Sequence, residues 1–543
     1  MRVGLERFLS YRTVYWFAVV ALFSTALYVR LTIPQTPLID PDLGGYLKPA
    51  LVALTEGHFQ HLEGRAFLYP GFIYLTLRIF CDFSAISIIQ HLLGLAAGGL
   101  LLVCWNRTGT LIVTRQISAE IYYVLGLGVT SLFLLNTAAI KFEHQIRPEA
   151  VIPFFAILNI FLNVEFVVAR RRLLNQQHAI FVAACNLFVG FFLYYLKAYF
   201  WLVTCLSTIP AWIILFDQKL ILTRMILWLG GSAILVVTLL VVPEERLSQS
   251  DPVSRTFLPT TLFVIHAKII RNQIARDVDR GVNVPYSTEF LRSTLQLLDT
   301  EILASKHTKK YQSLGFDPDY LMNENSFCDK FGALLQNGDT SIQQTKFYYH
   351  YFFRAWTHRP ARMLAKIGSQ LAIFYDGRHW RSPYKAARQL SLNRFYQRNC
   401  EVFEATQYVS NMDYPPLKHF LEKSQELSGT EETLFHPIAI HWVNYLLART
   451  LSLTIILLGI AASFVLWNTT RRQAYGPFLG VTALMFCYSL GTNLGVAIIH
   501  SLEVERYITN QLIYCVLPQC MTLYIVGEIT CLLWKRRGAP LPS

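Results

Sequence analysis

Long apolar runs separated by short polar turns make up most of the chain. A window of about 19 residues, close to the length that an α-helix needs to cross a bilayer, picks out about ten such runs. They cover 13–32, 84–105, 121–140, 150–168, 178–196, 199–216, 222–242, 443–467, 477–499 and 507–533. The pattern predicts an all-α polytopic membrane protein with about ten or more transmembrane helices.

One further apolar run is too short to cross a bilayer in the usual way. It covers 67–80, about 14 residues. Counting it as a span would invert the helices that follow and place the cluster Arg170–Arg172 outside. We therefore expect an interfacial or re-entrant helix at 67–80, while a short tilted span stays sterically possible.

The composition agrees with a membrane protein. Of the 543 residues, 53% are hydrophobic and only 15% are charged, which is too apolar for a soluble protein of this size. The formal net charge of +13 does not indicate nucleic acid, because the basic residues form short clusters at the ends of apolar runs. The first apolar run, 11–33, lacks a small-residue cleavage site, so we expect it to stay as a helix.

Basic clusters occupy every second turn between the spans, which is the pattern of cytoplasmic loops. They contain Arg2, Arg7, Arg12, Arg107, Arg115, Arg170, Arg171, Arg172, Lys219, Arg224, Arg471, Arg472, Lys535, Arg536 and Arg537. With a cytoplasmic N-terminus, the outer segments are 33–83, 141–149, the turn at Lys197, 243–440 and 500–506. These outer segments hold the unusual polar residues.

Three domains follow from this topology. Residues 1–242 form an N-terminal transmembrane domain with the first outer loop and the interfacial helix, and residues 441–543 form the C-terminal transmembrane helices. Residues 243–440 have mixed charge, scattered Pro and Gly, and partial helical periodicity. They predict an α-rich extracytoplasmic domain inserted between the two helix sets.

The first outer loop carries two carboxylates directly beyond the first span. It contains Asp40-Pro41-Asp42, with two glycines and Tyr46 shortly after. A partly desolvated carboxylate can take a proton from a hydroxyl or bind a metal ion. The alternative is a turn in which Asp42 caps the following helix.

Two further outer turns are dense in polar groups. The turn 143–149 contains Glu143, His144, Arg147 and Glu149, whose side chains must pair with each other, with water or with a ligand. The alternative is a solvated loop in which Glu149 complements a helix dipole. Lys197 lies between two apolar runs, where it either extends to the interface or meets an anionic headgroup.

The turn before the last span contains His500, Glu503, Glu505, Arg506 and Tyr507. Arg holds a phosphate with its planar fork of donors, and Tyr can donate a further hydrogen bond. The alternative is a self-neutralising pair of Glu and Arg.

Arg65 and Tyr69 lie at the approach to the interfacial helix and offer another phosphate contact. The stretch 347–376 interleaves aromatic and basic residues and predicts a membrane-surface amphipathic helix, with a wall for a sugar as the alternative.

Other kinds of chemistry have no motif in this sequence. We find no Gly-rich phosphate loop, no zinc-ligand spacing and no serine nucleophile elbow. Most of the ten cysteines lie in or beside apolar runs, where Cys behaves as a small hydrophobe. Cys328 and Cys400 lie in the long polar segment and could pair in an oxidising compartment, although nothing in the sequence brings them together.

The order of these features resembles the GT-C superfamily of polyprenyl-phosphate-dependent glycosyltransferases, which includes protein O-mannosyltransferases and lipid A aminoarabinose transferases. The resemblance covers roughly 1–240 and 440–535 and rests on short motifs. The matching features are Asp40 and Asp42 after the first span, the stretch Arg65–Tyr74, Arg147-Pro148-Glu149 in the second turn, Lys197 between two spans, and Glu505-Arg506-Tyr507.

The resemblance implies an inverting transferase that moves a sugar from a lipid phosphate or pyrophosphate carrier to a glycan, lipid or protein acceptor. It implies a site on the outer, periplasmic face of the bacterial inner membrane. The base or metal ligand of that family carries over to Asp40 or Asp42. Relatives have Asp-Glu adjacent where this chain has Asp-Pro-Asp, so the identity of the base and the use of a divalent cation stay open.

The other polar residues of the outer turns are the expected contacts of the substrate and the carrier phosphate. They are Arg65, Tyr69, Glu143, His144, Arg147, Glu149, Lys197, His500, Glu503, Glu505, Arg506 and Tyr507. In the resembling family, basic and tyrosine side chains hold the phosphate, which carries over most naturally to Arg147, Lys197, Arg506 and Tyr507.

Two other functions compete with this interpretation. An O-antigen-type polymerase or ligase also uses polyprenyl carriers and a large outer loop, but it consumes a lipid-linked oligosaccharide. A transporter usually places ionisable groups in mid-membrane within repeated halves. Here the polar clusters lie at span ends and no repeat is visible.

Overall fold

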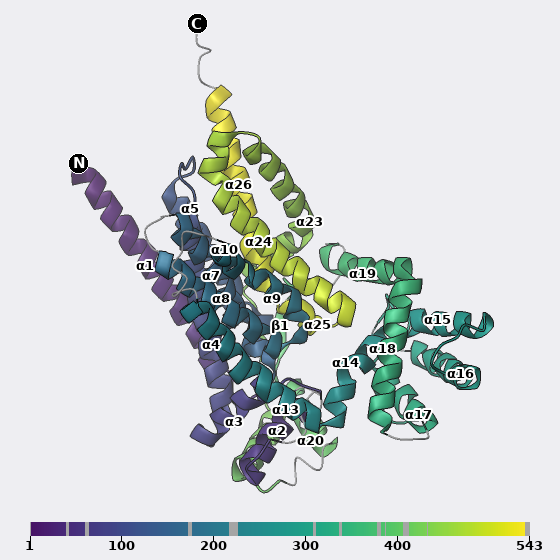
Figure 1. Ribbon diagram of the computed structural model, residues 1–543. Helices are drawn as coiled ribbons and strands as arrows, with labels where there is room; N and C mark the ends of the chain where they lie inside the picture. Colours follow the sequence, from purple (N-terminus) through teal and green to yellow (C-terminus); the bar gives the residue numbers. More distant parts are fainter. Residues whose placement is uncertain are drawn as a thin grey trace.

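The computed structural model is almost entirely helical (Figure 1). It describes residues 2–39, 43–59, 64–171, 176–216, 226–307, 311–335, 339–376, 382–385, 387–405, 412–431 and 433–537. Within these ranges the only sheet pairs two three-residue strands in antiparallel fashion, β1 (Gln389–Ser391) and β2 (Thr433–Phe435).

Among the described residues, nine helical segments are long and apolar enough to cross a membrane, and a bent helix pair makes up to ten. The segments correspond one by one to the ten apolar runs of the sequence, which confirms a multi-pass membrane protein. They are α1 (Arg2–Leu31, apolar from Tyr11), α4 (Ser84–Gly109), α5 with α6 (Ala119–Leu134 and Thr137–Glu143), α7 (Ile152–Arg171), α8 (Gln176–Leu196), Ala198–Leu215 with α9 and α10, Ile226–Gln249 with α12 and α13, α23 (Ile438–Leu466), α24 (Thr469–Ile499) and Glu505–Lys535 with α25 and α26.

The bent pair has a local cause. Asn136 lies between α5 and α6 in an extended conformation, and its side chain accepts hydrogen bonds from the backbone N–H groups of Ala138 and Ala139. This is an N-cap, so α6 starts as a new helix at an angle of 54° to α5. The bend redirects the chain toward the polar turn 143–149.

The short apolar run forms α3 (Leu68–Phe80). This helix is apolar but shorter than the segments that could cross a membrane. The helix ends at Cys81, whose φ of 50° is left-handed, and α4 begins at Ser84. Leu75, Ile79 and Phe80 are each more than half exposed. The length of α3 and its exposed apolar face agree with an interfacial or re-entrant helix beside α2 (Leu43–Glu56).

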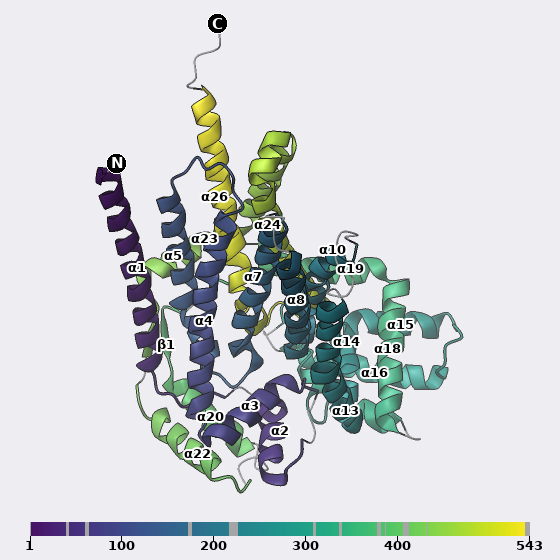
Figure 2. The ribbon, with the colours of Figure 1, turned by 60° about the vertical axis from the view of Figure 1, so that its left-hand side comes forward.

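The basic turns lie together at one end of the helix bundle. Arg171 donates to the carbonyls of Leu111 and Gln473, and Lys535 donates to Gln116. Figures 1 and 2 show both termini at this same end, as an even number of crossings requires. The polar turns singled out in the sequence therefore belong to the opposite end.

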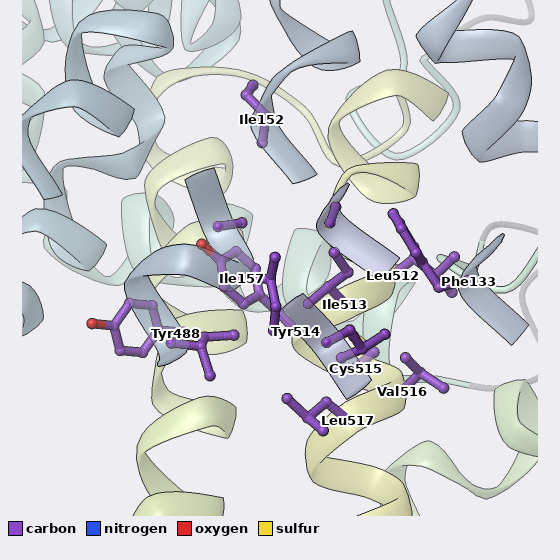
Figure 3. Close-up of a cluster of buried hydrophobic side chains, with 14 of the residues drawn as sticks. Phe133, Ile152, Ile157, Tyr488, Leu512, Ile513, Tyr514, Cys515, Val516 and Leu517 are labelled. Atoms are coloured by element: carbon purple, nitrogen blue, oxygen red, sulfur yellow. The ribbon is translucent and has the colours of Figure 1, made fainter. Parts of the chain in front are cut away.

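The centre of the bundle is a continuous apolar core. Figure 3 shows side chains from α5, α7, α24 and α26 meeting there, with Tyr488 beside the run Leu512–Leu517. Pro518 follows that run inside α26. Because these side chains are almost fully buried, the core fixes the ends of the spans relative to one another.

Residues 243–440 do not share a single core. Five helices form a lobe around a cluster of stacked aromatic rings that includes Phe263, Phe327 and Phe347, to the side of the bundle in Figure 1. Their bounds are α14 (Pro252–Ile265), α15 (Ala267–Asp279), α16 (Thr288–Ala304), α17 (Phe327–Leu334) and α18 (Thr340–His358). In contrast, α20 (Asn393–Ala405), α22 (Pro415–Ser428) and the small sheet pack beside α1, α4 and α6.

The stretch 347–376 differs from the single amphipathic helix predicted for it. It is divided between α18, which is part of the lobe core, and α19 (Pro360–Tyr375), which packs along α24. Asn493, on α24, donates to the Tyr375 hydroxyl, and Lys366 donates to the carbonyls of Ala497 and His500. Helix α19 is therefore held against the helix bundle by polar contacts as well as by its apolar face.

Candidate functional site

Lys197 lies at the junction of α8 and the next span, and it joins two of the polar turns. Its backbone is extended, and this conformation separates α8 from the helix that follows. The ammonium donates to the hydroxyl of Tyr46 at 2.7 Å and lies 3.3 Å from Oε1 of Glu149. Burial alone would lower the pKa of Lys197, but Glu149 and Tyr46 outweigh it and raise the pKa, so the side chain stays charged.

Glu149 is the centre of this group of charges. The side chain is completely buried, and Nε of Arg147 lies 3.5 Å from Oε2. Burial alone would raise the pKa of this carboxyl, but Lys197, Arg147 and Arg506 lower it to about 2. One carboxylate thus lies among the charges of three cations.

Arg506 and Tyr507 begin α25 (Glu505–Thr509) and complete the group. The Arg506 guanidinium lies over the Tyr507 ring at 5.1 Å, and Tyr507 packs edge-on against Tyr199. Asn510 donates to the Tyr199 hydroxyl. These contacts fix the start of the last span next to the turn at Lys197.

A cavity of about 700 Å³ opens beside these residues. Four of its lining side chains are cations, Arg65, Lys197, Arg398 and Arg506, and two are carboxylates, Glu244 and Asp319. Both carboxylates already accept hydrogen bonds, from the N–H of Phe67 and from the Tyr311 hydroxyl. The cavity is therefore suited to an anionic group.

The lining residues of this larger cavity are Tyr46, Gly64, Arg65, Ala66, Tyr194, Tyr195, Leu196, Lys197, Ala198, Tyr199, Glu244, Ser248, Ser254, Phe257, Leu258, Thr261, Tyr311, Asp319, Met322, Asn323, Arg398, Val496, Ile499, His500, Val504, Arg506 and Tyr507.

The same cavity has an apolar wall. Leu196, Val496 and Ile499 come from the ends of two spans, and Phe257 and Leu258 come from the first helix of the lobe. The cavity thus combines cations with apolar surface at the ends of transmembrane helices. That combination fits an amphiphilic ligand with a charged head.

A second, smaller cavity of about 230 Å³ adjoins the first and shares Arg398 and Arg506 with it. It lies between α6, α20 and the start of α25. Its lining residues are Ile39, Lys141, Phe142, Gln145, Arg147, Phe395, Arg398, Val504, Glu505 and Arg506. Among the predicted residues, Arg147 and Glu505 line this cavity, whereas Arg65, Lys197, His500 and Tyr507 line the larger one, and Arg506 lines both.

The predicted acidic pair, Asp40 and Asp42, lies outside the described residues. Ile39, before the pair, lines the smaller cavity, and Tyr46, after it, lines the larger one. Leu38 forms a parallel bridge to Gln145, with its N–H donating to the His144 carbonyl at 2.8 Å. The segment that leads into the acidic pair is thus fixed next to the smaller cavity.

A buried asparagine on α20 holds the other edge of that segment. Oδ1 of Asn399 accepts from the N–H of Ile39 at 2.8 Å, and Nδ2 donates to the Pro37 carbonyl at 3.2 Å. Nothing in the sequence pairs Asn399 with residues about 360 positions away, so this contact depends on tertiary structure.

Five of the described predicted residues line neither cavity. One of them, Glu149, still lies beside Arg147 and Lys197, which do line the cavities. Glu143 accepts two hydrogen bonds of 2.7 Å from Arg30 and one of 3.0 Å from His91. Nε2 of His144 lies 3.1 Å from the hydroxyl of Tyr396. Burial and the neighbouring His91 lower the pKa of His144 well below its usual value, so the ring stays neutral.

The remaining two are also engaged in contacts within the protein. Tyr69 is buried and donates to Gln90 at 2.7 Å. Glu503 accepts from the N–H and the hydroxyl of Ser313, so it fastens the turn before α25 to the lobe. These contacts give Tyr69 and Glu503 structural roles in this conformation.

Several side chains at the site were not predicted, among them Tyr46, Lys141, Tyr199 and Arg398. Tyr46 and Lys141 lie next to turns that the sequence predicted to be part of the site. Their positions close to Asp42 and Glu143 could have indicated them. Tyr199 is two residues from Lys197. Arg398 lies in the long middle segment, where the sequence gives no sign of its position.

Metal binding finds no further support among the described residues. They contain no group of three or more His, Cys, Asp or Glu side chains that could hold a metal ion. Cys328 and Cys400, the possible disulfide partners, are not joined to each other by a disulfide. A scan of protein-family models and searches of curated proteins and of solved structures found no match to this chain.

Proposed function

We propose that this protein is an integral membrane glycosyltransferase of the GT-C type, which moves a sugar from a polyprenyl-phosphate carrier to an acceptor, with inversion. The observation that carries the proposal is the larger cavity, in which a group of cations faces an apolar wall at the ends of the spans. A carrier of this kind has one anionic head, which matches the cations, and a long apolar chain, which matches the apolar wall.

The carrier lipid cannot leave the bilayer, so its head has to be bound where the spans end. Leu196, Val496 and Ile499 supply apolar surface at that level. Lys197 and Arg506 stand next to this surface and supply the positive charge. A phosphate held there leaves the sugar in the open part of the cavity, toward the acceptor.

Cations at the carrier phosphate serve the chemistry as well as binding. When the bond between the anomeric carbon and the phosphate oxygen breaks, the departing phosphate gains negative charge, and fixed donors stabilise it most at that moment. Lys197 and Arg147 lie within ion-pair distance of the buried carboxylate of Glu149, and Arg506 is close enough to lower the pKa of that carboxyl. Glu149 is accordingly a positioning residue and the cations are the binding residues.

The acceptor hydroxyl needs a base within hydrogen-bond reach. Asp40 and Asp42 are the candidates, since Ile39, directly before them, lines the smaller cavity. Attack on the face of the sugar opposite the phosphate inverts the anomeric centre. The base takes the hydroxyl proton, and the bond electrons leave with the phosphate.

The membrane orientation of the proposal follows from charge. The basic turns contact one another at the end of the bundle opposite the cavities. Because basic loops stay in the cytoplasm, the cavities belong on the outer face, and the lobe α14–α18 is extracytoplasmic. The bacterial inner membrane is the part of this proposal that rests on the resemblance to the GT-C superfamily and not on the charge pattern.

Purified protein incubated with radiolabelled polyprenyl-phosphate sugars and candidate acceptors tests the proposal. We expect release of the sugar from the lipid fraction, with loss of transfer in Asp40→Asn or Asp42→Asn protein that inserts and folds normally. An Asp413→Asn variant, which changes an exposed carboxylate far along the chain, is the matched control. If no lipid-linked sugar is bound or consumed, the proposal fails; full activity in both loop variants removes the base assignment.

A further inference from the structure

Helix α19 lies closer to the membrane than the five helices of the lobe. In both ribbon views it forms the edge of the lobe that faces the end of the bundle with the two termini (Figures 1 and 2). The Lys366 ammonium donates to the carbonyls of Ala497 and His500, at the cavity end of α24, at 2.6 and 2.8 Å. Nδ2 of Asn493 donates to the Tyr375 hydroxyl at 3.2 Å. The second half of α19 therefore runs along the last turns of a candidate transmembrane helix.

Helix α24 gives the level of these contacts in the bilayer. Its basic end, with Arg471 and Arg472, marks one membrane surface. A helix needs about 20 residues to cross the hydrocarbon core, so the core that starts at Arg472 ends near Asn493. Tyr375 thus lies at the edge of the hydrocarbon. Lys366 contacts residues one to two turns farther along α24, so it lies at the level of the lipid headgroups.

The face of α19 that is turned away from α24 carries no charge beyond its first turn. From Met363 to Tyr375 the exposed residues are Leu364, Ala365, Gly368, Ser369 and Ala372. Leu364 is 59% exposed. A helix that faces water usually carries charged residues on that side, whereas a helix in the membrane interface presents apolar residues to the acyl chains. Depth and composition together indicate that lipid covers this face.

Four arginines lie together where α19 begins. They come from the end of α15 and the start of α19, and we call them the arginine cluster: Arg276, Arg280, Arg359 and Arg362. The guanidinium of Arg359 donates to the side chain of Gln273 and to the carbonyl of Asn272, which joins the two helix ends. Burial, and then the charges of the other three arginines, lower the pKa of Arg359, so all three lie close to it.

Carboxylates of the same helices do not balance this charge. The two oxygens of Asp277 accept hydrogen bonds from a further arginine, Arg354, at 2.7 and 2.8 Å. Asp279 is the other acidic residue at this end of α15. The two helix ends therefore carry more arginines than aspartates. Arg280 and Arg362 are exposed, so the positive charge is presented at the surface.

The arginine cluster lies at a level where phosphate groups are available. Arg362 precedes Lys366 by about one helical turn, and Lys366 lies at headgroup level. Arginine binds phosphate oxygens through its planar fork of donors, and basic groups beside a membrane attract anionic lipids. An apolar face in the acyl region with arginines above it matches the two parts of a phospholipid.

We infer that α19 lies in the lipid leaflet at the cavity end of the bundle, and that the arginine cluster binds anionic phospholipid headgroups of this leaflet. The inference does not depend on the reaction proposed above. Lipid bound here also steadies one wall of the larger cavity, because Lys366 holds the end of α24 beside Ile499, which lines that cavity.

Photo-crosslinking of the full-length protein in vesicles tests both parts of the inference. The residue p-benzoylphenylalanine replaces Ala365, on the exposed face of α19. The vesicles contain equal amounts of phosphatidylglycerol and phosphatidylcholine, and each sample has one of the two lipids radiolabelled in its acyl chains. We expect crosslinks to lipid, with phosphatidylglycerol about fivefold ahead of phosphatidylcholine, because the arginine cluster collects the anionic headgroup next to α19.

Two other positions calibrate the crosslinking. Ile460 is 61% exposed on α23, so p-benzoylphenylalanine in its place should crosslink to lipid without a headgroup preference. Ser293 is exposed on α16, which lies farther from the membrane than α19, so no lipid crosslink is expected there (Figures 1 and 2). Absence of lipid crosslinks at Ala365 while Ile460 gives them, or crosslinks at Ala365 to a second protein chain only, overturns the position of α19.

Variants of the two exposed arginines assign the headgroup preference. The double variant Arg280→Gln with Arg362→Gln is expected to bring the lipid ratio at Ala365 to about one, while crosslinks to lipid persist. Arg280→Lys with Arg362→Lys keeps the charge and should stay within about twofold of the wild-type ratio. Arg292→Gln, an exposed arginine on α16, is the matched control and should leave the ratio unchanged. Equal crosslinking of the two lipids in the wild type, or an unchanged ratio in the glutamine variant, overturns the headgroup site.

Discussion

Two glutamates of one turn, six residues apart, have opposite surroundings. Glu143 is bound to Arg30 by two hydrogen bonds of 2.7 Å and to His91 at 3.0 Å. Glu149 lies 3.3 Å from Lys197 and 3.5 Å from Arg147, next to a region with cavities. The first carboxylate is held by three short hydrogen bonds, whereas the second lies among cations at longer distances. A saturated, fully hydrogen-bonded ion pair supports the fold, and a looser group of cations beside a cavity can bind a substrate.

The largest effect is expected from breaking the saturated pair. Replacing Arg30 with Met leaves Glu143 buried without its main partner, which costs about 3–5 kcal/mol of stability. We expect a large fall in the thermal unfolding midpoint in detergent, measured by tryptophan fluorescence. The double variant Arg30→Met with Glu143→Met removes both charges and is expected to recover much of the loss; equal midpoints in the single variant and the wild type would contradict a structural role.

A loss of function without a loss of stability is expected at the group of cations around Glu149. Arg506→Gln removes a cation that lines both cavities, so we expect binding of polyprenyl phosphate to weaken by about tenfold to a hundredfold. The unfolding midpoint should stay close to that of the wild type. Arg12→Gln, at the opposite end of the bundle, is the control. A change in stability as large as that of Arg30→Met would remove the distinction between the two regions.

Glu149 itself is expected to show an intermediate effect with a defined pH dependence. Its pKa of about 2 lies below the usual value, so the carboxylate stabilises the folded protein fully above about pH 4.5 and loses this contribution as the pH falls toward 2. Glu149→Gln should therefore lower the unfolding midpoint by a constant amount between pH 5 and pH 8. A difference that shrinks as the pH falls from 8 to 5 would contradict the lowered pKa.

The smallest effect is expected at a residue that acts through another. Gln370, on α19, accepts from the N–H of Leu502 at 2.7 Å and from the hydroxyl of Ser501 at 2.9 Å, and so holds the turn before Arg506. We expect Gln370→Ala to raise the KM for the carrier by about threefold with little change in kcat. Gln370→Met keeps the size of the side chain without the acceptor oxygen, so the KM should stay raised; a wild-type KM in this variant would show a purely steric role.

The sequence predicted the spans well because their signal is local. Ten apolar runs and the short run at 67–80 correspond to the helical segments of the structure and to α3. Each run must bury its own backbone in lipid, so its length and composition suffice to find it. The bend at Asn136 is visible only in the structure, since a cap inside an apolar run does not change the average hydropathy.

The site was predicted in part, for a related reason. Once the orientation was fixed, Arg147, Lys197 and Arg506 had to lie at the same end of the bundle. The membrane orientation alone does not show which residues at that end of the bundle line a common cavity. Glu143 stood as good a candidate as Glu149 in the sequence, because its partner Arg30 is more than a hundred residues away.

By itself, then, the sequence determined that the chain is a multi-pass helical membrane protein with its unusual polar turns at one end, since hydropathy and charge act residue by residue along the chain. Only the tertiary structure decided that α19 packs along α24, that α20 brings Arg398 and Asn399 to the first outer loop, and that Glu149 rather than Glu143 lies among three cations beside the cavities. Contacts between distant segments depend on how the helices pack, and packing is a property of the whole fold.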